Sequence, residues 1–225
     1  AMQILGKPSM MHQTNGRKIE AAREKGEEIV KHLKASPSFL ESLAPLITEY
    51  VSLKDGLVEE DAEAIKKSAA RFLELLRSVP SSDLAGPSLD AWNASSTQIK
   101  QGLESVALAG DIQQQRKAFD PLSEAFVKLL MTFRHRMPEP ILVYFCPMAF
   151  AGQGAYWIDT REEVRNPYYG RKPFEGQDML RCGELVERIP PDPGSNETIP
   201  TQDVSHGKIH TGEHSGHPAH TGGSK

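Results

Sequence analysis

Cysteine is scarce in this chain, since Cys146 and Cys182 are the two that occur among its 225 residues. One pair excludes a framework of several disulfides and is compatible with a single disulfide or a single metal site. The sequence has no C-x-x-C motif, which excludes c-type haem attachment and makes a four-ligand zinc site a weaker candidate. The two cysteines therefore pose one question, namely whether they form a disulfide or bind a soft metal ion.

Several other features that would assign a function are missing. No apolar run approaches the roughly 18 residues of a transmembrane helix, and the formal net charge of −4 argues against nucleic acid as a partner. The sequence contains no G-x-S-x-G, no phosphate-binding glycine loop and no H-E-x-x-H, so we predict that the protein is not an enzyme. No signal peptide is visible, and we expect an export signal to have been removed.

What the sequence does contain is sulfur in two short clusters. Cys146 and Met148 form the motif C-P-M, and Met179 and Cys182 form M-L-R-C. Thiolate together with thioether sulfur is the ligand set that selects Cu(I). We therefore assign Cys146, Met148, Met179 and Cys182 as a candidate Cu(I) site, with zinc or no metal as the alternatives.

A disulfide between Cys146 and Cys182 is the competing interpretation, and the residues alone do not separate the two. Such a bridge would close a loop of a few dozen residues and would stabilise the domain by about 3–4 kcal/mol in the chain-entropy model. Met148 and Met179 would then fill gaps in the core. The disulfide and the metal site can also be two redox states of the same residues.

Helical periodicity dominates the part of the chain before the cysteines. We predict an antiparallel four-helix bundle over residues 38–137, in which short loops join amphipathic helices. Ser38 and Glu41 have the spacing of a capping box, so we expect the first helix of the bundle to begin at Ser38. Pro45 and Pro121 fall inside helical patterns and predict a kink or a bend at each.

The period changes after the bundle. Residues 138–190 are predicted to form a small, loop-rich cap with two or three short strands. The candidate strands are Ile141–Phe145, Ala155–Ile158 and Leu185–Glu187. Residues 1–37 are expected to form a disordered N-terminus plus an exposed helix, and residues 191–225 a disordered tail. The predicted fold class is thus mainly α, with a small β-containing cap packed on the bundle.

Histidine supplies a second, weaker set of candidate ligands. The C-terminal tail carries five of the eight histidines, at His206, His210, His214, His217 and His220. The small and polar residues between them oppose a stable helix, so we interpret the tract as low-complexity sequence that chelates borderline metals weakly. In the predicted folded part, His135 is expected to be a solvated helix residue, and Asn166 is expected to hydrogen-bond loop carbonyls.

The order of several motifs resembles a known family. These motifs are R-K-A-F-D-P-L-S from Arg116, C-P-M-A-F from Cys146, G-A-Y-W from Gly154, N-P-Y-Y-G from Asn166 and M-L-R-C-G from Met179. They resemble a domain of unknown function that occurs free-standing and secreted, or at the C-terminal end of periplasmic adaptor subunits of copper and silver efflux systems of the resistance-nodulation-division type. The resemblance covers residues 43–188, and residues 171–178 look like an insertion.

The resemblance implies a location and a set of partners. It points to the periplasm and to an efflux adaptor or a metallochaperone as a partner, in addition to the metal ion. We therefore expect an exported soft-metal-binding module that takes part in copper or heavy-metal handling or efflux. The alternative is a disulfide-stapled structural or interaction module that docks on an efflux adaptor or another envelope protein.

Overall fold

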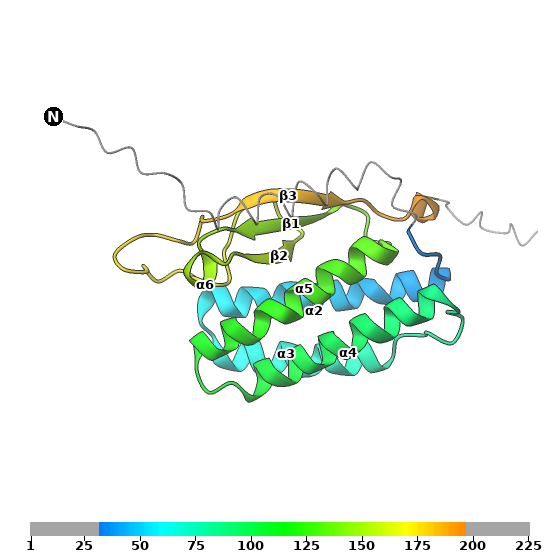
Figure 1. Ribbon diagram of the computed structural model, residues 1–225, viewed down its shortest axis with the longest axis horizontal. Coiled ribbons are helices and arrows are strands. Elements are labelled where there is room, and N and C mark those ends of the chain that lie inside the picture. Colours follow the sequence, from blue (N-terminus) through cyan, green and yellow to red (C-terminus); the bar gives the residue numbers. More distant parts are fainter. Residues whose placement is uncertain (1–31, 197–225) are drawn as a thin grey trace, which may run out of the picture. The chain divides into compact units, whose positions relative to one another are not determined.

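Four long helices pack together in the computed structural model, which describes residues 32–196, and a small sheet lies on one side of them (Figure 1). The helices are α2 (Pro37–Glu59), α3 (Ala62–Arg77), α4 (Pro87–Leu108) and α5 (Ile112–Phe133). Helix α2 packs against α3 and α5, and α4 packs against the same two helices. The mainly helical fold with four packed helices is thus confirmed, and their antiparallel arrangement stays a prediction.

The bundle core is built from the apolar face of each helix and is rich in aromatic rings. Tyr50 stacks on Phe126 with ring centroids 5.1 Å apart, and Phe72 meets the same ring edge-on at 5.2 Å. Such offset and edge-to-face pairs add to the stabilisation that burial of the rings provides. Within residues 32–196, no helix is both long and apolar enough to cross a membrane.

The start of α2 differs from the sequence-based expectation. The N-cap is Ser36, whose Oγ accepts a hydrogen bond from the N–H of Phe39 at 3.3 Å. The assignment of Ser38 as the cap is wrong, because Pro37 has a fixed φ that suits the first helical position and lacks the N–H that would need a partner there. Helix α2 runs through Pro45, as α5 runs through Pro121.

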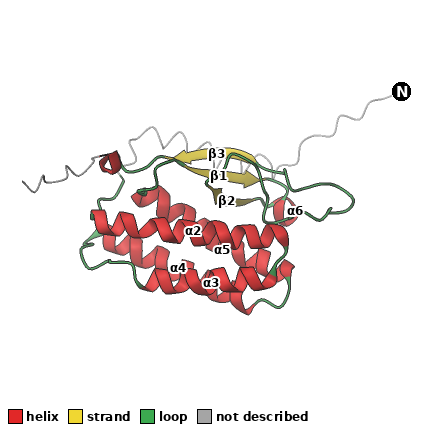
Figure 2. Ribbon diagram, turned by 180° about the vertical axis from the view of Figure 1, so that it is seen from behind, coloured by secondary structure: helices red, strands yellow, loops and turns green. Residues whose placement is uncertain are grey.

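Three antiparallel strands follow the bundle, as the periodicity predicts. They are β1 (Ile141–Cys146), β2 (Ala155–Asp159) and β3 (Glu184–Ile189), and β1 lies between the other two. A short helical turn, α6 (Ala149–Gly152), joins β1 to β2, and a short 3₁₀ helix, η2 (Pro193–Asn196), follows β3. Seen from behind, the sheet again lies over α2 and α5, with α3 and α4 farther away (Figure 2).

The outer edge of β2 is closed by side chains of α2, of α5 and of the N-P-Y-Y-G segment. Tyr50 of α2 accepts a hydrogen bond from the N–H of Ile158 at 3.3 Å. Ser123 of α5 donates its hydroxyl to the carbonyl of Tyr156 at 2.7 Å, and Tyr168 donates to the same oxygen. An unpaired strand edge would otherwise expose free backbone groups. These bonds fix the sheet on the bundle and so fix the strand ends that carry the first cysteine.

Part of the sequence-based description falls outside the described residues. The expected N-terminal helix lies almost wholly in residues 1–31, and the tail from residue 197 onward includes all five of its histidines. The proposed domain boundaries at residues 37 and 191 therefore stay predictions, as does the metal-binding role of that tract.

Candidate functional site

The sheet brings the two cysteines together. Cys146 is the last residue of β1, and Cys182 lies two residues before the start of β3. Because β1 and β3 are antiparallel neighbours, with Phe145 opposite Glu184, the last residue of β1 and the first residue of β3 lie at the same end of the sheet. The two Sγ atoms lie 3.3 Å apart, and both residues are free thiols. Cys146 is fully buried, while Cys182 keeps part of its surface exposed.

The distance between the sulfurs lies between the values that a disulfide and a metal chelate require. A disulfide holds its sulfurs at about 2.05 Å. Two thiolates on one tetrahedral ion, with bonds of about 2.3 Å, would lie about 3.8 Å apart. The observed 3.3 Å therefore needs an adjustment of about half an ångström for a tetrahedral chelate, a larger one for a two-coordinate ion that lies between its sulfurs, and more than an ångström for a disulfide.

The electrostatics of the pair disfavour two negative charges without a cation. Burial raises the pKa of Cys182, and the adjacent Cys146 sulfur raises it further, while the backbone N–H of Met148 acts in the opposite direction. The physical reason is that a second thiolate would stand next to the first in a poorly solvated place. A bound cation would remove that repulsion, so metal binding would release protons from this pair.

The two methionines lie in the turns that carry the cysteines. Met148 follows β1 and is 52% exposed. Met179 is partly buried, and its carbonyl accepts a hydrogen bond from the N–H of Cys182 at 3.0 Å. The structure thus unites the two thiols, and both methionines lie between the two cysteines along the chain, one near each of them. Whether the thioethers complete the site stays a prediction.

Asn166 connects the turn that carries Cys182 to the N-P-Y-Y-G segment. This fully buried side chain donates from Nδ2 to the carbonyl of Cys182 at 2.6 Å and accepts from the N–H of Tyr168 at 2.8 Å. Its own N–H donates to the carbonyl of Leu180 at 2.9 Å. The expected role of Asn166 in binding loop carbonyls agrees with these contacts. It positions the second sulfur and does not touch it.

The Asn166→Asp variant should weaken this positioning. The carboxylate keeps the acceptor for Tyr168, but it lacks the donor for Cys182 and places a negative charge against a carbonyl. We expect the equilibrium constant for disulfide formation with glutathione to fall by about tenfold, since the turn that carries Cys182 is held less firmly and a lost buried hydrogen bond is worth about 1–3 kcal/mol. The exposed Asn93→Asp variant carries the same charge change and should leave that equilibrium as in the wild type. Equal behaviour of the two variants would remove Asn166 from the site.

The aromatic residues around the cysteines divide into two groups. Trp157 and Tyr168 are buried in the cap core, and the ring of Trp157 stacks on Tyr144 at 5.4 Å. Gly183 allows the second sulfur turn to approach that core, because a Cβ there would lie 2.4 Å from the Trp157 ring. Glycine is therefore required directly after Cys182.

Tyr169 of the N-P-Y-Y-G segment forms a wall beside the thiols. Burial raises the pKa of Tyr169, and the neighbouring Cys146 and Cys182 raise it further. The hydroxyl donates to the carbonyl of Met148 at 2.7 Å, and the ring contacts Phe174 with centroids 5.0 Å apart. Phe174 belongs to the apparent insertion at residues 171–178, so that loop supports the wall of the site.

His135 is not the solvated helix residue that the sequence suggested. It lies beyond the end of α5 and is fully buried. Its Nδ1 accepts from the N–H of Met137 at 3.1 Å, so Nε2 carries the proton and donates to the carbonyl of Ile189 at 3.0 Å. Burial lowers the pKa of this imidazole, which keeps it neutral. Both nitrogens are occupied, and His135 therefore has no free nitrogen for a metal.

In the described part of the chain, the common metal-ligating side chains form no cluster larger than the cysteine pair that could hold a metal ion. Within residues 32–196, no group of three or more histidine, cysteine, aspartate or glutamate side chains converges in a way that could hold a metal ion. A structural zinc site normally needs four such ligands. The arrangement therefore suits an ion that accepts two sulfur ligands, or a disulfide.

The comparison with known families covers the helices and stops short of the cysteines. Residues 46–137 match a family model described as a protein of unknown function (DUF3347). This stretch is less than half of the chain and ends before β1, so it supports a domain-of-unknown-function family for the bundle alone. Neither the curated proteins nor the solved structures gave a match to the chain.

Proposed function

We propose that the protein binds one Cu(I) ion through the thiolates of Cys146 and Cys182. The observation that supports this proposal is the 3.3 Å separation of their sulfurs, reached by residues that lie 36 positions apart in the sequence. Cu(I) prefers soft sulfur ligands. A two-thiolate site suits such an ion better than zinc, which normally takes four ligands in a structural site.

The surroundings assign a role to each residue of this site. Cys146 is the buried anchor, and Cys182 is the ligand that an incoming ion reaches first, because part of its surface faces solvent. Tyr169 limits the access of water from one side. Met148 and Met179 are the candidate thioether ligands. When bound, the ion would supply the positive charge that allows both thiols to lose their protons.

The cellular role follows from the resemblance of the sequence to exported domains linked to metal efflux. We propose that the protein works in the periplasm, where it holds copper or a related metal and passes it to an efflux adaptor or a metallochaperone. The histidines of the tail would collect metal weakly and serve as an auxiliary site. In this proposal the protein is a binding module with no catalytic activity.

A disulfide-stapled interaction module is the second candidate, and the same short distance favours it. In an oxidising compartment Cys146 and Cys182 could close a bridge that holds the start of β3 against the end of β1. The protein would then act as a rigid unit that docks on an efflux adaptor or another envelope protein. Counting free thiols in protein purified without reductant distinguishes the two candidates.

Anaerobic titration with Cu(I) against a competing chelator tests the first candidate. We expect one tightly bound ion per chain, with an affinity that falls as the pH falls, because protons compete for the thiolates. Replacing either cysteine with serine should weaken binding by about 100-fold or more, since even changes beside a metal ligand cost about 10–100-fold.

The methionine variants separate the thiolate pair from the full four-residue site. Met148→Leu and Met179→Leu should each weaken binding by about tenfold if the thioethers are ligands. Met131→Leu on the surface of α5 is the matched control and should bind as the wild type does. Wild-type affinity in the Cys146→Ser/Cys182→Ser variant would contradict the proposed site altogether.

A further inference from the structure

The spacing of the two thiols depends on the geometry of the centre that would join them. Sulfurs on a tetrahedral centre with bonds of about 2.3 Å lie about 3.8 Å apart. On a pyramidal centre, with bonds of about the same length and angles close to a right angle, they lie only about 3.3 Å apart. The Sγ atoms of Cys146 and Cys182 are separated by 3.3 Å. The pair therefore has the spacing that a pyramidal centre requires, with no adjustment.

The number of ligands at this place also favours a pyramidal centre. Within residues 32–196, no third histidine, cysteine, aspartate or glutamate joins the two thiols in a group that could hold a metal ion. A tetrahedral zinc site would therefore lack two of its ligands. Trivalent arsenic is a soft, pyramidal centre that forms three bonds, and one of them can go to a hydroxyl group. Two protein thiols are then a complete set.

Burial of the pair favours a product without charge. Cys146 is fully buried, and Cys182 keeps only part of its surface exposed. Two thiolates side by side repel each other in such a place, and a single monovalent cation leaves one negative charge on the pair. Arsenous acid is uncharged at neutral pH, and its product with two thiols is uncharged as well. Such a ligand avoids the cost of placing a charge there.

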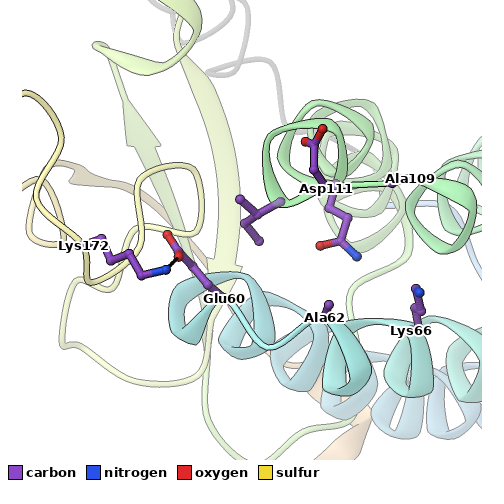
Figure 3. A pocket seen from close by; sticks show the side chains of 9 residues that line it. Glu60, Ala62, Lys66, Ala109, Asp111 and Lys172 are labelled. Atoms are coloured by element: carbon purple, nitrogen blue, oxygen red, sulfur yellow. Dashed lines mark hydrogen bonds and ion pairs between the residues drawn. The ribbon is translucent and has the colours of Figure 1, made fainter.

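The surroundings of the thiols are apolar. Met148 is 52% exposed, and Phe174, whose ring contacts Tyr169 at 5.0 Å, is 48% exposed. The loop that carries Phe174 also carries Lys172, which pairs with Glu60 beside a cleft of about 290 Å³ (Figure 3). None of the residues that line this cleft contains sulfur. An uncharged ligand that reacts with sulfur therefore suits the thiol pair and not the cleft.

We propose that the reduced cysteine pair binds trivalent arsenic by condensation with arsenous acid. Two S–H bonds and two As–OH bonds break, two S–As bonds form, and each proton leaves with a hydroxyl group as water. Neither arsenic nor sulfur changes its oxidation state, so the step needs no oxidant or reductant. The third position of arsenic keeps its hydroxyl group, on the side where Cys182 is exposed. The inference shares the thiols with the proposed Cu(I) site but does not depend on Cu(I) binding.

Titration of the full chain with arsenite at pH 7 tests the proposal. The protein is first reduced with a phosphine, because a thiol reductant would compete for arsenic. Calorimetry should show one arsenic per chain, and the intact mass should show that the adduct forms with the loss of two water molecules. An adduct that has lost one water molecule, and so uses one thiol, would overturn the proposal. The absence of any adduct would do the same.

Cysteine and methionine variants show which sulfurs hold the arsenic. Cys146→Ser and Cys182→Ser should each weaken arsenite binding by about 100-fold or more, because the second S–As bond forms within the molecule. Circular dichroism checks that both variants are folded, and Cys182→Ser changes the less buried position. Wild-type affinity in a folded cysteine variant would overturn the proposal.

Met148→Leu and Met179→Leu are the matched controls. Both should bind arsenite as the wild type does, because a thioether does not displace the hydroxyl group from arsenic. A tenfold loss of arsenite affinity in either variant would overturn the two-thiol site. The same two variants are expected to lose affinity for Cu(I), so the two ligands are tested separately. Arsenite binding without Cu(I) binding would contradict the proposed function and support this inference.

Discussion

Replacing Lys54 with methionine is expected to lower the free energy of unfolding by about 3–5 kcal/mol, because it leaves the Asp159 carboxylate buried without this cation. Neither side chain has any exposed surface, and Nζ of Lys54 donates to Oδ2 of Asp159. Arg161 contacts the other oxygen of Asp159 at 3.0 Å, which places the expected loss toward the lower end of the range. Urea denaturation monitored by tryptophan fluorescence measures the change.

The matched control is Lys100→Met on α4, where the lysine is half exposed and lies 3.9 Å from Glu104. A surface pair of this kind is worth about 0–1 kcal/mol, so the control should stay near the wild type. The double variant Lys54→Met/Asp159→Leu should regain part of the stability, because it leaves no unpaired charge. If Lys54→Met costs no more than Lys100→Met, the pair does not hold α2 against β2.

Periodicity predicted the secondary structure because the spacing of apolar residues within each helix or strand follows the face that the element buries. The four helices and the three strands follow local patterns of apolar residues, and the predicted strands differ from β1, β2 and β3 by at most two residues at either end. Local chemistry failed at Ser36, where two serines flank a proline and only the tertiary structure shows which one caps the helix.

The proximity of the two sulfur motifs could be expected from the sequence. The residues that hold the two motifs in place could not. Two strands, each with a cysteine at or near one end, bring those cysteines together if the strands pair antiparallel, which is the commoner pairing. Hydrogen bonds to residues that are distant in the sequence determine the roles of Asn166, Tyr169 and His135. Lys54 looks like an ordinary surface lysine beside Asp55, and its partner Asp159 lies 105 residues away.

Arg116 connects the bundle to the segment that leads to the second cysteine. The side chain is 3% exposed, and its Nε donates to the carbonyl of Pro167 at 2.9 Å. Its Nη2 donates to the carbonyl of Tyr169 at 2.9 Å and to that of Leu57 in α2 at 3.3 Å. One guanidinium thus joins α5, the end of α2 and the N-P-Y-Y-G segment.

The Arg116→Lys variant is expected to lose about 3 kcal/mol of unfolding free energy, although the charge is kept. An ammonium group is compact and cannot present the planar fork that serves carbonyls on two sides, so buried acceptors lose their donors. Arg71→Lys on the exposed face of α3 is the matched control and should change stability by less than about 0.5 kcal/mol. Urea denaturation of the two variants compares them directly.

The same variant should also disturb the thiols, because Arg116 holds the segment that carries Tyr169 and Asn166. Gly170 ends this segment at φ +71°, and a Cβ there would lie 2.3 Å from Nη2 of Arg116, so Gly170→Ala should displace the same guanidinium. We expect both variants to shift the disulfide equilibrium with glutathione in the same direction as Asn166→Asp. A loss of stability without that shift would mean that the bundle supports the cap but does not set the distance between the two sulfurs.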